Sequence, residues 1–289
     1  MPVKTPMEVP VMARARRHAA RIASRPALWQ RLPWPLLFTG LMFGFMYIPI
    51  LVLGVYSFNE SRFTANWTGF TLDWYRRLFN DARILNALGT SLVVACTAVL
   101  ISAVIGTLMA VGLARYRFPG KGIYLGITYL PLIVPDITIA VSTLVFLAVI
   151  SLPLSLGTII SAHIVFCLAY IGIVISTRLT GLDPHLEEAA QDLGATPLQS
   201  FLRVLLPQLT PAIVSGCLLA FVLSMDDFLI ASFTAGGGAV TLPMEIFSRI
   251  RTGVKPDINA LSVLLILASG VIAFVAEYIR LQSEQRGIR

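Results

Sequence analysis

Three carboxylates interrupt long apolar stretches of this sequence. Asp136 follows Pro135 in one apolar block, and Asp226 and Asp227 stand together in a later one. A charged side chain at the centre of a membrane helix costs roughly 2.5–3.5 kcal/mol on insertion scales, so each acid is expected to face a cavity or a partner. No Lys or Arg lies inside these blocks. Acids without protein counter-ions favour a cationic ligand or protons, and the carbonyls freed by Pro131 and Pro135 could also coordinate a cation.

A structural role is the alternative for each acid, because an Asp can accept hydrogen bonds from Ser, Thr or a backbone amide. Asp226 and Asp227 project about 100° apart on a helix and cannot both face one stripe. At least one of the two is therefore a candidate cap near a helix end. We expect His163, in another apolar block, to make a hydrogen bond between helices rather than to bind a metal.

Composition indicates which elements position these side chains. The 289 residues are 56% hydrophobic and only 13% charged, which is too apolar for a soluble globular protein. We predict an all-α polytopic membrane protein, with six transmembrane helices in a permease domain over 35–280, each long enough for a hydrocarbon core of roughly 30 Å. The predicted spans are Pro35–Ser57, Leu85–Ala114, Ile123–Ile150, Gly157–Thr177, Leu209–Thr234 and Asn259–Arg280.

The positive charge predicts the orientation of these spans. The two tails and the loops at 115–122 and 178–208 carry fifteen Lys and Arg, whereas the other three loops carry seven. Both termini and the 178–208 loop are thus expected in the cytoplasm. The basic segment 1–34 is either an interfacial helix or a solvated tail, and 281–289 is a cytoplasmic tail. At 1.5 Å per residue, Asp136 is expected about 20 Å along its helix and Asp226 about 25 Å along its own, both in the outer half of the membrane.

The 178–208 loop reads as two short helices. Asp183 is a good N-cap with Pro184 after it, and Gly194 supplies the left-handed residue that ends the first helix. Thr196-Pro-Leu-Gln199 begins the second helix with a capping box, and Pro207 is expected to limit it. One side of the first helix is apolar and the other polar. The apolar side holds Leu186, Ala189, Ala190 and Leu193, and the polar side Glu187, Glu188, Gln191 and Asp192.

This loop resembles a known family motif. Glu188-Ala189-Ala190, three residues, Gly194, nine residues and then Val204-Leu205-Leu206-Pro207 is similar to the EAA loop of bacterial ABC importer permeases, which usually have Ile where Val204 stands. The resemblance implies the type I ABC importer permease fold, in which the loop is a coupling helix seated in a cleft of the ATP-binding subunit. The residues that it assigns to coupling are Glu187, Glu188, Ala189, Ala190, Asp192, Gly194 and Pro207.

Other stretches narrow the resemblance. Ser57–Phe63, Trp67–Tyr75, Leu223–Phe228 and Asn259–Leu261 resemble the second permease subunit of spermidine/putrescine ABC importers, and the likeness covers nearly the whole chain from Pro35. It implies a bacterial inner-membrane heterodimer with a sister permease, two cytoplasmic ATPase subunits and a periplasmic polyamine-binding protein. It also implies that Asp136, Asp226, Asp227 and Trp67 contact the polyamine.

The chain has no G-x-x-x-x-G-K-[ST] motif, so ATP and Mg²⁺ are expected on the partner ATPase subunits, with no cofactor or metal in this chain. The expected function is a transporter subunit, not an enzyme, and not a nucleic-acid-binding protein. Three alternatives stay open. The cargo can be another small organic cation or solute; the chain can be a passive cation channel, which leaves the loop without a role; or it can be an intramembrane aspartyl protease, whose Tyr-Asp and Gly-x-Gly-Asp contexts are missing here.

Overall fold

The computed structural model describes residues 34–61, 66–183, 185–251, 253 and 256–286. The possible interfacial helix within 1–34 lies outside these residues, apart from Trp34. The chain divides into two units, 1–53 and 54–289. Of the first unit the structure describes most of α2 (Trp34–Tyr56), an apolar helix that ends inside the second unit.

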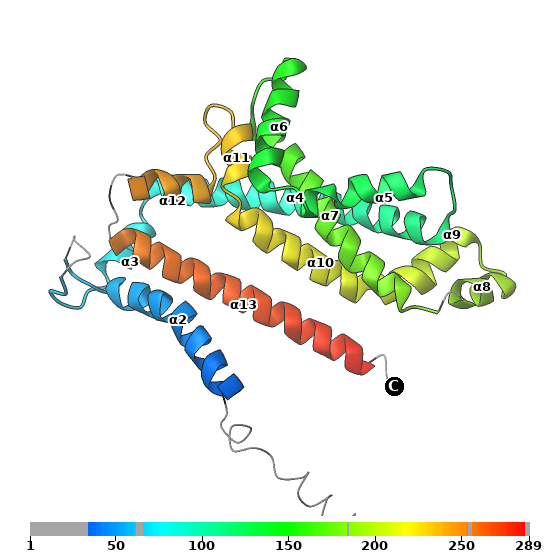
Figure 1. Cartoon of the computed structure of the whole chain (residues 1–289), viewed down its shortest axis with the longest axis horizontal. Coiled ribbons are helices and arrows are strands. Elements are labelled where there is room, and N and C mark those ends of the chain that lie inside the picture. Colours follow the sequence, from blue (N-terminus) through cyan, green and yellow to red (C-terminus); the bar gives the residue numbers. More distant parts are fainter. Residues whose placement is uncertain (1–33, 62–65, 184, 252, 254–255, 287–289) are drawn as a thin grey trace, which may run out of the picture. The chain divides into compact units, whose positions relative to one another are not determined.

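Helices joined by turns and loops make up the described part of the second unit, which has no strand beyond an isolated antiparallel bridge between Asn59 and Phe70 (Figure 1). Its elements are α3 (Asp73–Leu78), α4 (Ala82–Arg115), α5 (Lys121–Tyr129), the 3-10 turn η2 (Leu130–Leu132), α6 (Asp136–Val149), α7 (Leu156–Thr180), α8 (His185–Asp192), α9 (Pro197–Ser200), the π-helix η3 (Phe201–Leu205), α10 (Leu206–Asp226), α11 (Leu229–Thr234), α12 (Leu242–Arg251) and α13 (Pro256–Arg286). The helix α13 continues into the predicted cytoplasmic tail as far as Arg286.

Within the described residues, five helices are long and apolar enough to cross a membrane: α2, α4, α7, α9–α10 together, and α13. The predicted third span is instead a broken pair, in which the segment Lys121–Leu132 (α5 with η2) and α6 meet at 109°. If this pair counts as one span, the described residues hold six. Pro131 and Pro135 have no N–H to continue a helix, and both Ile133 and Val134 donate to the Leu130 carbonyl at 3.0 Å. The estimate that Asp136 lies about 20 Å along one helix is therefore wrong, because the chain turns between Leu132 and Asp136.

The fifth span also departs from the prediction at both ends. Pro207 does not end the helix of the loop: α9, η3 and α10 run on as one apolar segment from Pro197 to Asp226. In the π-helix the Leu206 N–H donates to the Phe201 carbonyl, five residues back. The wider turn leaves Pro207 in the first turn of α10, where a residue without an N–H is tolerated. At its C-terminal end α10 stops at Asp226, and α11 is a separate helix.

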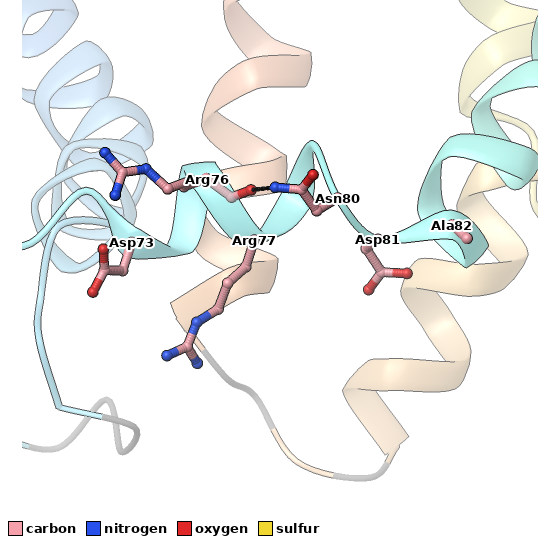
Figure 2. Close-up of a pocket in the computed structure, with 6 residues that line it drawn as sticks. All are labelled: Asp73, Arg76, Arg77, Asn80, Asp81 and Ala82. Atoms are coloured by element: carbon pink, nitrogen blue, oxygen red, sulfur yellow. Dashed lines mark hydrogen bonds between the residues drawn. The ribbon is translucent and has the colours of Figure 1, made fainter.

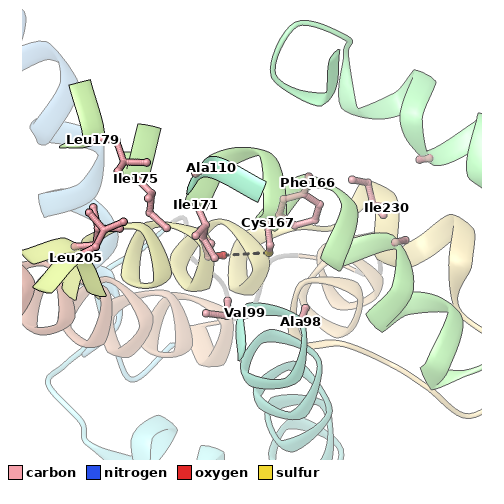
Figure 3. Close-up of a cluster of buried hydrophobic side chains, with 14 residues drawn as sticks. Ala98, Val99, Ala110, Phe166, Cys167, Ile171, Ile175, Leu179, Leu205 and Ile230 are labelled. Atoms are coloured by element: carbon pink, nitrogen blue, oxygen red, sulfur yellow. Dashed lines mark hydrogen bonds between the residues drawn. The ribbon is translucent and has the colours of Figure 1, made fainter. Parts of the chain in front are cut away.

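The core forms where α4, α7 and α10 pack together. Figure 3 shows its side chains, with Ile171 of α7 at the centre of the cluster and the Cys167 thiol aimed at a backbone carbonyl of α10. Gly106 and Gly216 bring α4 and α10 close to α7, since a Cβ at either position would stand 3.3 Å from Ile171 atoms. Small residues at crossing points are the usual way in which membrane helices gain packing contacts. This three-helix core is the scaffold from which α6, α11 and the α8–α9 loop project.

Candidate functional site

A cavity of about 270 Å³ lies where the broken helices meet α7. Asp136, Asp226 and Asp227 all line it, although Asp136 and Asp226 are 90 positions apart in the sequence. The other lining residues are Pro131, Phe166, Tyr170, Leu223, Phe228, Leu229 and Ile230. Sequence reasoning did not identify the three aromatic residues of this lining, Phe166, Tyr170 and Phe228, as site residues. Nothing in their local sequence distinguishes them from other apolar helix positions.

Trp67, the fourth residue predicted to contact the ligand, is not among the residues that line the cavity. Its indole is about half exposed and stands edge-on to the Tyr56 ring, with 6.3 Å between centroids. The structure therefore brings together the three acids and leaves Trp67 in the loop before α3.

The two neighbouring acids have different environments. The Asp227 carboxylate, one residue before the N-cap position Phe228, caps the first turn of α11: its Oδ1 accepts from the Ile230 N–H at 3.2 Å and its Oδ2 from the Ala231 N–H at 2.7 Å. These bonds occupy donors that the start of a helix otherwise leaves unpaired. The prediction that one member of the pair is a cap is confirmed, and the capping member is Asp227.

Asp136 and Asp226 are the more available carboxylates. Asp136 is the first residue of α6, Asp226 is the last of α10, and both are exposed. Within the part of the chain that the structure describes, neither carboxylate takes part in a hydrogen bond or an ion pair. These two acids thus face the cavity with their hydrogen-bonding capacity unused, whereas most of the capacity of Asp227 is committed to α11.

His163 of α7 lies behind Asp227 and is 1% exposed. Its Nδ1 stands 2.7 Å from the Ser224 Oγ of α10, and its Nε2 stands 3.3 Å from the Asp227 Oδ2. The predicted hydrogen bond between helices is confirmed. Cys167, one turn further along α7, directs its Sγ to the Ala220 carbonyl at 3.9 Å instead of joining a metal-binding set.

A second hollow, on α3, is wider but chemically different (Figure 2). Its volume is about 720 Å³, and it is lined by Asp73, Arg76, Arg77, Asn80, Asp81 and Ala82. Two acids and two bases line it, and the Arg77 guanidinium lies over the Trp74 ring at 4.9 Å. None of the three acids from the apolar blocks lines it, so the candidate ligand site is the smaller cavity.

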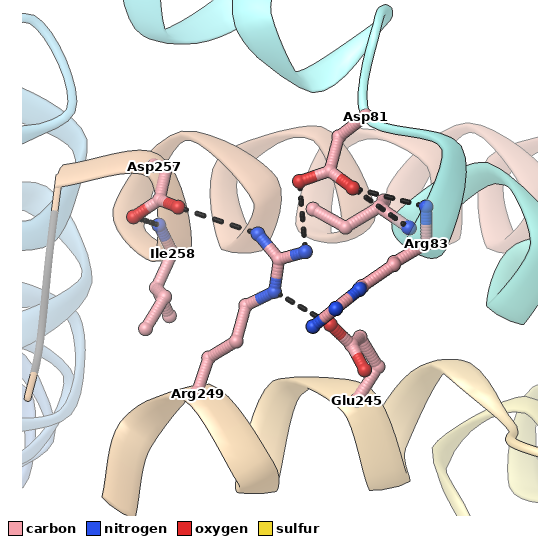
Figure 4. A network of polar contacts seen from close by, with 7 residues as sticks. Asp81, Arg83, Glu245, Arg249, Asp257 and Ile258 are labelled. Carbon is pink, nitrogen blue, oxygen red and sulfur yellow. Dashed lines mark hydrogen bonds and ion pairs between the residues drawn. The ribbon is translucent and has the colours of Figure 1, made fainter. Parts of the chain in front are cut away.

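Arg249 of α12 joins carboxylates from three segments (Figure 4). Its Nε donates to Glu245 at 2.8 Å, its Nη2 to Asp81 at 2.8 Å and its Nη1 to Asp257 at 3.4 Å. Asp81 is also the N-cap of α4. Burial alone would raise the pKa of Asp81, but the hydrogen bonds from Arg249, Ile84 and Arg83 and the Arg249 charge lower it overall. Burial opposes a raised pKa of Arg249, but the hydrogen bonds and charges of Glu245 and Asp81 raise it overall.

The loop at 178–208 has the local geometry that the sequence predicts. Gly194 has φ of 90°, its N–H donates to the Gln191 carbonyl, and the next N–H donates to the Ala190 carbonyl at 3.0 Å. This is the Schellman arrangement of a helix end. Thr196 and Gln199 form the reciprocal capping box at the start of α9.

The structure separates the two glutamates that the sequence places on one polar face of α8. Glu187 turns inward and forms an ion pair with Arg115 at the end of α4, and its carbonyl accepts from the buried Ser200 hydroxyl at 3.3 Å. Glu188 is 72% exposed and lies 3.0 Å from the His185 Nδ1. The hydrogen bond to Glu188, followed by the charge of Asp183, raises the pKa of His185.

The apolar side of α8 is largely exposed. Polar contacts of Glu187 hold α8 to the scaffold, so its leucines are left outside: Leu186 is 41% and Leu193 is 91% exposed. Ala189 and Asp192 are exposed as well, and Ala190 is half-buried. Pro207 is exposed at the start of α10. It lies away from the segment 193–198 that joins α8 to α9, which we call the knuckle. The knuckle thus presents an apolar surface that no described residue covers.

Comparison with known proteins identifies relatives over most of the chain. Residues 102–287 match the family model described as "Binding-protein-dependent transport system inner membrane component". The chain is 45% identical over 266 residues to the putrescine transport system permease protein PotI of Escherichia coli K12, covering 90% of this chain and 95% of that protein. It is 38% identical over 242 residues to the spermidine/putrescine transport system permease protein PotC of Haemophilus influenzae, covering 84% and 94%.

Solved structures share the fold at low sequence identity. A bacterial alginate ABC transporter, in complex with its alginate pentasaccharide-bound periplasmic protein, aligns with a TM-score of 0.67 at 19% identity, over 88% of this chain and 97% of that one. An amino acid ABC transporter solved with histidines aligns with a TM-score of 0.57 at 16% identity, over 74% and 100%. The helical arrangement is therefore that of ABC importer permeases.

Proposed function

The chain belongs to the family of binding-protein-dependent transport system inner membrane components, and from this premise we propose that it forms half of the path by which a polyamine, putrescine or spermidine, crosses the bacterial inner membrane. It is a multi-pass permease of the ABC importer type. The proposal adds the cargo, the partner subunits and the orientation of the chain in the membrane.

The observation that carries the cargo proposal is the cavity at the two helix breaks. Asp136 and Asp226 supply unengaged negative charge, while Phe166, Tyr170 and Phe228 supply aromatic faces. Ammonium groups are attracted to both, and a flexible polyamine offers at least two of them joined by apolar methylene groups. Relatives named for putrescine and for spermidine/putrescine transport support the same class of cargo. An anionic solute would meet uncompensated carboxylates in this cavity.

The proposed assembly contains a sister permease, two cytoplasmic ATPase subunits that bind ATP and Mg²⁺, and a periplasmic polyamine-binding protein. The α8–α9 knuckle supports the ATPase contact, because Leu193 and Leu198 are 91% and 66% exposed. Apolar surface on a polar loop is typical of a docking site. Glu188 and His185 border this surface and are proposed to contact the ATPase subunit.

Both termini and the α8–α9 loop are proposed to be cytoplasmic, on the balance of Lys and Arg between the loops. Single cysteines at Asn66 and Gly237 should react with a membrane-impermeant thiol reagent added from outside, in a background without the three native cysteines. Cysteines at Lys121 and Gln199 should react with the reagent only after the membrane has been permeabilised. The reverse pattern would overturn the orientation and the ATPase contact with it.

The assembly is tested by reconstitution of the chain with its sister permease and ATPase subunits in proteoliposomes. The proposal predicts ATP hydrolysis that a putrescine-loaded binding protein stimulates, together with ATP-dependent accumulation of putrescine. A passive cation channel would conduct without ATP, and an intramembrane protease would cleave a peptide without either. If the complex accumulated a different solute with ATP but neither putrescine nor spermidine, the cargo proposal would be contradicted. The proposal that the chain is an importer subunit would still hold.

A further inference from the structure

The break between α10 and α11 has no backbone cause in its own sequence. The residues from Ser224 to Ile230 include neither Pro nor Gly, the two residues that most often interrupt a helix. Yet Asp227 has ψ of 121°, and α11 starts afresh after it. Side-chain contacts must therefore hold the chain in this conformation.

Those contacts converge on Asp227. The N-terminal amides of α11 bind its carboxylate from one side, and the His163 ring approaches it from α7 on the other. The His163 Nδ1 shares a hydrogen bond with the Ser224 Oγ at 2.7 Å, and its Nε2 lies 3.3 Å from the Asp227 Oδ2 without forming a hydrogen bond to it. One buried ring thus links the last turn of α10 to the first turn of α11.

The cavity depends on this link because its wall follows the break directly. Phe228, Leu229 and Ile230 all line the cavity, and Asp226 immediately precedes the capping residue. If α10 continued as a helix through Asp227, these side chains would leave their present positions. The Phe166 ring, which also lines the cavity, lies 5.1 Å from the His163 ring and limits its movement.

We propose that His163 is a positioning residue of the cavity: through Ser224 and Asp227 it holds the break that presents the Asp226 carboxylate and the Phe228 ring to a di- or polyammonium ligand. The inference rests on the proposed cargo, since it assigns the purpose of the break to that ligand. His163 itself does not contact the ligand, because its ring is enclosed between α7 and α10.

The test compares putrescine uptake by His163→Leu, His163→Gln and wild type in the reconstituted complex, at equal amounts of assembled protein. His163→Leu leaves Ser224 and Asp227 without their shared partner, so the KM for putrescine should rise about tenfold, with a smaller change in the maximal rate. His163→Gln retains a donor and an acceptor and should restore much of the affinity. Because Asp227 carries the effect, His163→Leu combined with Asp227→Asn should raise KM less than the product of the single effects.

Ser102→Ala is the matched control. It removes another buried hydrogen bond to α7, from the Ser102 Oγ to the Ile164 carbonyl at 3.1 Å, without touching the cavity. It should leave the KM unchanged even where it lowers thermal stability. If His163→Leu does not assemble, Ser224→Ala replaces it in the test and should also raise the KM for putrescine.

An unchanged KM in His163→Leu, or in Ser224→Ala where that replaces it, would overturn the assignment, as would an equal rise in Ser102→Ala. A wild-type complex that accumulates no polyamine would instead refute the proposed function. The two failures are therefore distinguishable within one experiment.

Discussion

Arg115, the last residue of α4, forms an ion pair with Glu187 of α8. The helix α4 packs along α7 and α10 through the core, and its first turn is capped by Asp81, which Arg249 also binds. One continuous helix therefore joins the network on α12 to the loop proposed to meet the ATPase. Figure 1 shows α8 at the opposite end of α10 from α11.

Charge reversal at this pair should impair coupling. Arg115→Glu places two acids together and releases α8 from α4, so putrescine transported per ATP should fall several-fold. The pair is only partly buried, at 25% and 19% exposure, so its loss should cost roughly 1 kcal/mol of stability and leave the complex assembled. Adding Glu187→Arg restores an opposite-charge pair and should recover coupling. A double variant no better than either single one would exclude this role.

Gly194 provides a second test of the loop. Its φ of 90° disfavours a residue with a Cβ, although a side chain there would meet open space. Gly194→Val should therefore misplace the knuckle through backbone strain alone, at a cost of about 1–2 kcal/mol, and lower binding-protein-stimulated ATPase activity. Asn adopts this conformation more readily, so Gly194→Asn is the control and should keep most of the activity. Equal activity in all three proteins would remove the coupling role of this helix end.

Acid should weaken the attachment of α12 to α4. Because the pKa of Asp81 is lowered in the folded protein, its stabilising contribution is complete above the unfolded value of about 3.9 and is lost as pH falls through the lower folded value. Asp81→Asn retains an N-cap but removes the charge. Thermal unfolding of the purified complex should therefore show a smaller loss of stability below about pH 4 in the variant than in wild type. Parallel curves for the two proteins would contradict this.

Local signals in the sequence predicted local structure well. Gly194, the Thr196 capping box and the apolar spans each depend on residues within a few positions of one another, and the structure has them. Pro131 and Pro135 indicate a disturbed helix, but the 109° turn between the segment Lys121–Leu132 and α6 depends on how α6 packs against α11. The estimated distance of Asp136 along one helix was therefore wrong, even though Asp136 does reach the cavity of the other two acids.

The sequence did not predict which residues of distant elements form pairs. Arg249 and Asp81 are 168 positions apart, and His163 and Ser224 are 61 apart. Charge and hydrogen-bonding capacity are visible at each position, but a single sequence does not say which partner the fold brings close. The same limit applies to Glu187, whose inward direction follows from Arg115 and not from the pattern of α8.

The most direct measurement is ATP-driven uptake of labelled putrescine by proteoliposomes that contain wild type, Asp136→Asn, Asp226→Asn or Asp227→Asn, with assembly quantified on the same membranes. Asn keeps the size of Asp but removes the charge that offsets an ammonium. Asp136→Asn and Asp226→Asn should assemble normally and lose roughly tenfold or more of the uptake per complex. Asp227→Asn should lower assembly or thermal stability more than the other two, because Asp227 holds α11 and His163. Full uptake in all three variants would contradict a polyamine path through this cavity.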